Sequence, residues 1–163
     1  MLATKIMLVL GERTWTNEAL HLACAAARRQ NATIILIKMI PVVHPQMLGT
    51  TAGYLQFTSQ DEQDIEAYTA TAEEYNVVFT IQFCQYTSYL HGVVDAAQQL
   101  GVSDVVIYMP THMPFGRVIG WHQLQERWLR WQLHHHHQQL HTLVRNNNTL
   151  EWTPTLVLNH PSY

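Results

Sequence analysis

The stretch VVDAAQQLGVSDVVIYMP (residues 93–110) decides the fold of this chain. Its first half carries apolar residues at helical spacing and ends at Gly101, because glycine readily takes the left-handed conformation that terminates helices. Its second half contains DVVIYM, a β-branched and apolar run that is typical of a buried strand. A helix that leads directly into a buried strand favours an α/β fold.

The rest of the chain continues this alternation of strand and helix. Further runs of strand length are KIMLVL (5–10), TIILIKMI (33–40) and VVFTIQFC (77–84), and amphipathic segments separate them. The alternation in VVFTIQFC predicts a half-exposed strand near a sheet edge. We expect a long helix over residues 121–144 and a fifth strand, TPTLVLN, over 153–159. The order predicts a parallel sheet with helices on both faces.

Length and composition indicate a single domain, residues 1–163. Hydrophobic residues make up 47% of the chain and charged residues 13%, which argues against disorder. The net charge of -3 argues against a general nucleic-acid binder. No apolar run is long enough to be a signal or a membrane span. Cys24 and Cys84 form no paired motif, so we expect buried thiols and a cytoplasmic protein.

Four stretches together resemble the universal stress protein family. They are KIMLVL followed by a turn and NEALHLACAAARR, then TIILIKMIPV, VVDAAQQLGVSDVVIYMP and WTPTLVLNH. The resemblance covers nearly the whole chain and implies a three-layer α/β/α sandwich of the adenine nucleotide alpha hydrolase-like type. In that fold the five parallel strands have the order 3-2-1-4-5. Nucleotide-binding members share an Asp after the first strand and G-x2-G-x9-G-[ST] after the fourth.

Both nucleotide motifs are altered in this chain. Gly11 stands at the position of the Asp, Gly116 and Gly120 are spaced G-x3-G, and no later glycine follows. The resemblance therefore implies a degenerate pocket at the switch point between the first and fourth strands, and no bound cofactor. The alternative is that ATP or AMP is still held at the strand ends, by Leu10, Gly11, Ile40, Thr111, Gly116, Arg117 and Gly120.

A run of histidines offers a second candidate site. His134, His137 and His141 share one face of the expected helix, and the last two have the spacing that can clamp a transition metal. Adjacent histidines point around a helix rather than toward one ion, so we expect no resident metal and keep these three as weak candidates. The alternatives are a solvated helix face and a pH-responsive module, because histidine titrates near neutrality.

Two segments could form protein interfaces. Trp121, Leu124, Trp128 and Trp131 recur on one stripe of the expected helix, among arginines, and Trp and Arg are enriched at binding hot spots. The alternative is a broad surface that faces the core. In dimers of the resembled family the last strand pairs with its twin, so the resemblance implies a homodimer through Thr155, Leu156, Val157 and Leu158.

No catalytic motif stands out. The chain has no GxSxG, no P-loop and no GxGxxG, and no acid–base pair is apparent, so we predict no enzyme beyond a possible slow ATPase. The leading hypothesis is a non-enzymatic, universal stress protein-like domain that binds a partner or ligand in stress response or regulation. The alternatives are an ATP/AMP sensor and a His-rich metal- or pH-responsive module.

Overall fold

The computed structural model describes residues 4–49, 58–109, 119–146 and 149–154. Helices and strands alternate along the chain as the sequence predicts. The elements are β1 (Lys5–Val9), α1 (Arg13–Gln30), β2 (Thr33–Pro41), a 3₁₀-helix η1 (Pro45–Met47), α2 (Ser59–Glu74), β3 (Phe79–Tyr86), α3 (Tyr89–Leu100), β4 (Asp104–Ile107), α4 (Ile119–His135), β5 (Gln139–Asn146) and β6 (Thr149–Pro154).

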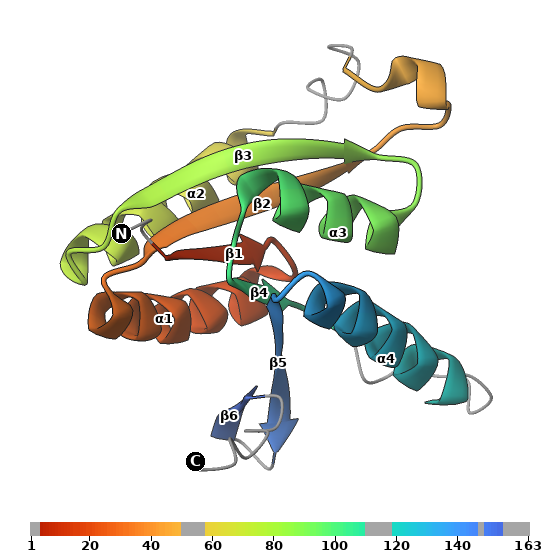
Figure 1. Ribbon diagram of the computed structural model, residues 1–163. Coiled ribbons are helices and arrows are strands. Elements are labelled where there is room, and N and C mark those ends of the chain that lie inside the picture. Colours follow the sequence, from red (N-terminus) through yellow and green to blue (C-terminus); the bar gives the residue numbers. More distant parts are fainter. Residues whose placement is uncertain (1–3, 50–57, 110–118, 147–148, 155–163) are drawn as a thin grey trace, which may run out of the picture.

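The described strands form one sheet in the order β3-β2-β1-β4-β5-β6. Neighbours from β3 to β5 are parallel, which confirms the predicted order 3-2-1-4-5. β6 is an addition that runs antiparallel to β5. Figure 1 shows how β5 and β6 continue the sheet below β4. The edge strand β3 alternates between exposed and half-buried residues over its first half, as its sequence predicts.

Helices cover both faces of the sheet and complete the predicted three layers (Figure 1). One core lies between the sheet and helices α1 and α2 and includes Leu8, Ala23 and Tyr68. The other lies between the sheet and helices α3 and α4 and includes Met7, Val93 and Leu129. Met7 and Leu8 are adjacent and fully buried because β1, an unbroken apolar run, is covered on both sides. Among the described helices, none is long and apolar enough to cross a membrane.

The predicted helix over 121–144 is wrong at its C-terminal end, because α4 ends at His135. His137 takes a left-handed conformation, with φ of 60°, which most residues avoid. Its N–H donates to the carbonyl of His134. Histidine is among the non-glycine residues that enter this region. Gln138 is then buried and donates from Nε2 to the carbonyls of Ala97 and Val102, which fixes the chain on the end of α3.

The fifth parallel strand is therefore β5 and not the predicted segment 153–159. Leu140 packs into the α3/α4 core and Leu143 into the α1/α2 core, so the segment buries both faces as an inner strand does. In the sequence, Leu129, Leu133 and Leu140 have a spacing that fits one stripe of a helix, and this spacing concealed the strand. Residues Thr155, Leu156, Val157 and Leu158 lie outside the described residues, so the predicted pairing of last strands stays a prediction.

A largely buried hydrogen bond between two side chains fixes β5 to β4. Nε2 of His141 lies 2.8 Å from Oδ1 of Asp104, and their side chains are 11% and 17% exposed. The Ser103 hydroxyl donates to the other carboxylate oxygen of Asp104. Burial tends to raise the pKa of Asp104, but hydrogen bonds from His141 and Ser103 outweigh it, and the net pKa is lowered. The ionised form of Asp104 therefore stabilises the fold.

The substitution Asp104→Asn tests this stabilisation, since it keeps the shape and removes the charge. We expect it to lower the free energy of unfolding by about 1–3 kcal/mol near neutral pH. The folded pKa is lowered, so the contribution is complete above the ordinary aspartate pKa of about 3.9 and is lost as the pH falls from there through the folded pKa. Urea unfolding across this pH range measures the difference in free energy of unfolding between the variant and the original protein. Asp95→Asn, at an exposed position of α3, is the control. A difference for Asp104→Asn that does not change with pH would contradict the stabilising role of the ionised Asp104.

Candidate functional site

The carboxyl end of β1 is the centre of the candidate site. It lies between β2 and β4, where the connections of the sheet diverge to opposite faces, and ligands of open α/β sheets bind at this switch point. Leu10 donates its N–H to the carbonyl of Ile37, which carries the pairing with β2 one residue past the strand. Gly11 donates its N–H to Oγ1 of Thr16, 3.0 Å away on α1. This bond closes the turn into α1.

Aromatic side chains fill the space beside Gly11. A Cβ atom on Gly11 would lie 2.7 Å from Cβ of Tyr108 and 3.1 Å from the ring of Trp15. Tyr108 follows β4, Trp15 lies in α1, and their ring centroids are 5.2 Å apart. The first contact is shorter than side chains tolerate and involves an atom close to the backbone. Gly11, the position at which the sequence resemblance expects an Asp in nucleotide-binding proteins, therefore has no room for a side chain.

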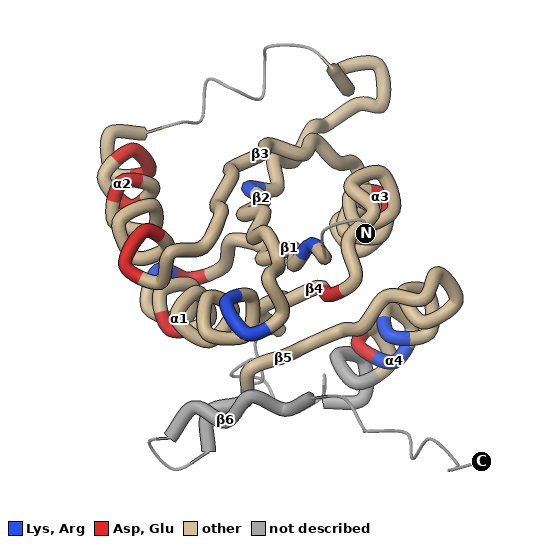
Figure 2. Tube along the Cα trace, turned by 60° about the vertical axis from the view of Figure 1, so that its left-hand side comes forward, with Lys and Arg blue, Asp and Glu red and all other residues tan. Residues whose placement is uncertain are grey.

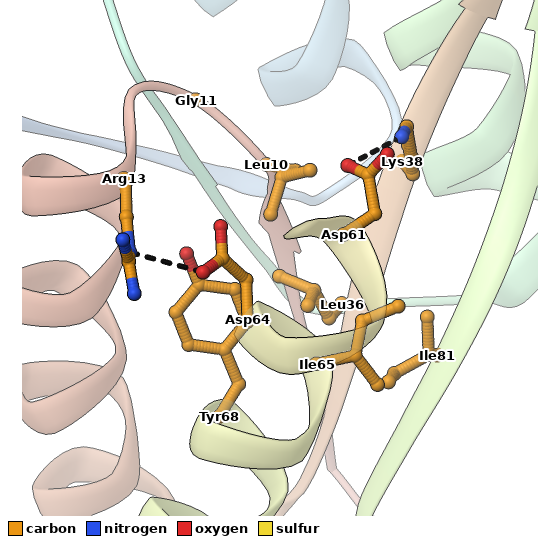
Figure 3. Close-up of a pocket in the computed structure, with 10 residues that line it drawn as sticks. All are labelled: Leu10, Gly11, Arg13, Leu36, Lys38, Asp61, Asp64, Ile65, Tyr68 and Ile81. Atoms are coloured by element: carbon orange, nitrogen blue, oxygen red, sulfur yellow. Dashed lines mark ion pairs between the residues drawn. The ribbon is translucent and has the colours of Figure 1, made fainter. Parts of the chain in front are cut away.

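A cavity of about 120 Å³ opens between this turn and α2. Figure 3 shows two ion pairs around it, one from β2 to α2 and one from α1 to α2. Nζ of Lys38 lies 2.7 Å from Asp61, and Nε of Arg13 lies 2.9 Å from Asp64. The lining residues are Leu10, Gly11, Arg13, Leu36, Lys38, Asp61, Asp64, Ile65, Tyr68 and Ile81.

Asp61 is held from two sides. It lies in the first turn of α2, where its carboxylate accepts the N–H of Thr58 while the Thr58 hydroxyl accepts the N–H of Asp61. This reciprocal arrangement is a capping box. The hydrogen bond from Lys38 and then that from Thr58 lower the pKa of Asp61. The carboxylate is thus kept ionised, close to Lys38 and in a fixed position.

Tyr68 forms part of the cavity wall. It is 3% exposed, and burial together with the carboxylate of Asp64 raises the pKa of its hydroxyl. A phenol with a raised pKa stays protonated at neutral pH. The cavity therefore offers two carboxylates that are paired with two cations, and a neutral hydroxyl group.

The structure brings together only some of the residues predicted to hold a nucleotide. Leu10 and Gly11 line the cavity. Ile40 is 3% exposed in β2 and is not among the lining residues. Gly120 lies in the first turn of α4. Thr111, Gly116 and Arg117 fall outside the described residues, so their placement stays a prediction.

The charged residues of this site were not predicted from the sequence. Lys38 is the one charge inside the apolar run TIILIKMI, and a lysine that faces a buried helix layer needs an acidic partner. Asp61 and Asp64 belong to a segment with six acids and no base, which has the composition of a solvated helix face. Only the lysine carried a usable signal, because it interrupts an apolar run of strand length.

The three weak histidine candidates do not share a helical face. His134 lies in α4 and His137 follows its end, whereas His141 lies in β5 and pairs with Asp104. The helical spacing does not extend to His141, because α4 ends at His135. In the part of the chain that the structure describes, no three His, Cys, Asp or Glu side chains gather as metal ligands do.

A second, polar cavity of about 420 Å³ lies beside α3. Cys84, His91 and Asp95 are among its lining residues. Burial and then the Asp95 carboxylate raise the pKa of the Cys84 thiol. A thiol activated for nucleophilic attack needs the opposite shift. Cys24, which is fully buried, has a pKa raised to about 11 by burial.

Comparison with known proteins shows the architecture. No protein family profile and no curated protein sequence matches the chain. A universal stress protein family protein from Burkholderia pseudomallei superposes with a TM-score of 0.57 at 14% identity, over 85% of this chain and 94% of that one. A universal stress protein in complex with cAMP gives 0.53 at 11% identity, over 74% and 86%. One from Archaeoglobus fulgidus gives 0.51 at 13% identity, over 77% and 89%.

These structures confirm the resemblance seen in the sequence. Because their sequence identity to this chain is low, these structures show a common architecture and nothing beyond it. The parallel order 3-2-1-4-5 between two layers of helices is the arrangement that they share with this chain. The chain has the universal stress protein fold.

Proposed function

We propose that the chain is a non-enzymatic, universal stress protein-like binding domain whose nucleotide pocket is degenerate. The observation that carries this proposal is the cavity at the carboxyl end of β1, which has a volume of about 120 Å³. Pockets for drug-sized ligands have volumes of roughly 300–1,000 Å³. A mononucleotide belongs to that size range, and its phosphates would meet the carboxylates of Asp61 and Asp64.

The charges of the cavity support the same proposal. Lys38 and Arg13 each lie within 2.9 Å of an acidic side chain of α2. An incoming phosphate would have to displace Asp61 from Lys38, although the capping box also holds that carboxylate. It would then leave an ionised Asp61 close to its own negative charge, which is unfavourable in a partly buried site. Lys38 and Arg13 therefore serve to hold α2 against β2 and α1, and a phosphate would have to compete with these contacts.

The alternative is an ATP- or AMP-binding sensor. A solved structure with the same fold is in complex with cAMP, which makes a nucleotide the natural ligand to test. The sensor would use the predicted residues Leu10, Gly11, Thr111, Gly116 and Arg117. A catalytic role has less support, because the described thiols have raised pKa values.

A homodimer through residues 155–158 belongs to the proposal. β6 pairs along β5 from Asn146 to His141, so the edge of β5 is occupied within the chain. Pairing between copies would therefore involve residues that follow β5 in the chain, such as 155–158. Sedimentation equilibrium measures the assembly state, and a monomer at all concentrations contradicts this part of the proposal.

Calorimetric titration with ATP and with AMP tests the main proposal. We expect no binding at ligand concentrations up to about 1 mM, with or without magnesium, which corresponds to less than about 4 kcal/mol of binding free energy. Micromolar affinity for either nucleotide would establish the sensor instead. In the variant Asp61→Asn/Asp64→Asn the two acidic charges are removed, so we expect weak AMP binding to become measurable there. This comparison shows whether the paired carboxylates exclude the anion.

A double-mutant cycle tests the closed position at Gly11. We expect Gly11→Ala to lower the free energy of unfolding by about 1–3 kcal/mol, because its Cβ would overpack against Tyr108. In the background of Tyr108→Gly, which lacks the opposing Cβ, the same change should cost less by at least about 0.5 kcal/mol. Thermal or urea unfolding of the four proteins gives the coupling. Additive effects would mean that Tyr108 does not close the site.

A further inference from the structure

An apolar groove lies between the first turn of α3 and the exposed side of α4. Its volume is about 500 Å³, and its walls include Tyr89, Leu90 and His91 from α3 and Leu124, Gln125 and Trp128 from α4. The ring of His91 on α3 packs edge-on against Trp128 on α4, with ring centroids 4.9 Å apart. This groove shares no residue with the cavity at β1.

α4 is apolar on two sides, and only one of them faces the sheet. Leu129 and Leu133 are fully buried in the core. Leu124 and Trp131 are 59% and 61% exposed, although both are large and apolar. With the half-buried Trp128 they follow the spacing i, i+4, i+7, which is one stripe of a helix. An exposed stripe of this kind beside a groove marks an interaction surface.

The charges around this stripe are mainly positive. Arg127 is exposed, and Arg130 lies 2.7 Å from Glu126, the acidic residue of α4. The exposed histidines 134–137 follow at the end of the helix. Figure 2 shows this basic character on α4 and the contrasting row of acidic residues on α2. Asp95 of α3 lines the neighbouring polar cavity and not the groove.

A second copy of this chain does not suit the groove. Two α4 helices placed face to face would bring the exposed Arg127 of both copies to the same interface, and like charges repel. The acidic helix α2 of another copy has the right charge, but its outward residues are mostly Glu, Gln and Ala and provide no large apolar anchor. A contact between α2 and α4 would also be head-to-tail and would not close into a dimer.

We propose that the α3/α4 groove binds an acidic amphipathic helix of a partner protein. An amphipathic helix places apolar side chains at i, i+3, i+4 and i+7 into such a groove. It would cover Leu124, which lines the groove, and Trp131, which follows on the same stripe of α4. Acidic residues on the flanks of the partner helix would then face Arg127, which is exposed. This inference rests on the proposed function in one respect, namely that the domain acts by binding a partner.

Nucleic acid and membrane surfaces fit this groove less well. Arg127 and Arg130 are the fixed positive charges on the described part of α4, and one of them is already paired. Electrostatic binding to phosphates needs several such contacts. The groove is a hollow between two helices, lined by His91 and Trp128 among others, whereas a membrane requires an apolar face that projects from the surface.

A displayed peptide library tests the proposal. The peptides have about sixteen residues, enough for four helical turns. Their Leu, Phe or Trp anchors are fixed at helical spacing, and each flanking position is randomised among Asp, Glu, Lys and Arg. We expect the full chain to select peptides with an acidic flank. Fluorescence anisotropy of a selected peptide should show affinity at least about tenfold above that of its charge-reversed form.

Matched variants locate the binding surface. Leu124→Glu and Trp131→Glu change exposed residues of the stripe, and each should weaken the selected peptide about tenfold or more. Val78→Glu is the control, because Val78 is 66% exposed and lies outside the groove. Equal thermal unfolding of the three variants shows that each is folded.

Several results would overturn the proposal. These are selection of basic peptides, selection of none, and an equal loss of binding in the Val78→Glu variant. Anionic vesicles or a single-stranded RNA that bind through Leu124 when acidic peptides do not would assign the groove to another class of partner. A dimer that Leu124→Glu dissociates would assign it to a second copy. Nucleotide titration reports separately on the β1 cavity, so the two proposals can fail independently.

Discussion

The burial of β1 on both faces is the constraint on which the rest of the structure depends. Met7 and Leu8 are fully buried on opposite sides of the sheet, and β1 pairs with β2 on one edge and β4 on the other. Such a strand needs a helix layer above and below it, and parallel neighbours need crossover connections. The three layers follow from these two needs. The same strand leads through Leu10 into the turn at Gly11, and so it also fixes where the candidate site lies.

That site shows how a typical ligand position of an open α/β sheet can be filled by the protein's own side chains. The turn after β1 is tight, and Tyr108 and Trp15 occupy the space beside it. Lys38 and Arg13 bring positive charge to the cavity, and α2 supplies a carboxylate for each. The aromatic pair and the ion pairs link α1, α2, β2 and the end of β4. Groups at a typical ligand position thus contribute to the cohesion of the domain.

The parallel sheet could be predicted because its strands are unbroken apolar runs between amphipathic helices, as in residues 93–110. The C-terminal region could not, because a tertiary contact decides it. Gln138 is held by the end of α3, and His137 provides the left-handed turn without a glycine. Leu10 and Gly11 were predictable from their position after a strand. Asp61 and Asp64 were not, since their roles depend on Lys38 and Arg13, which are distant in the chain.

The pairing of β6 along β5 has a consequence for the behaviour of the protein on dilution. Exposed sheet edges are templates for association, and proteins commonly protect them by contact with another subunit. Protection by another subunit is lost at low concentration, because it follows mass action. Here the hydrogen-bonding edge of β5 is satisfied by the next segment of the same polypeptide. Its shielding is therefore a unimolecular property and is the same in a dilute sample as in a concentrated one.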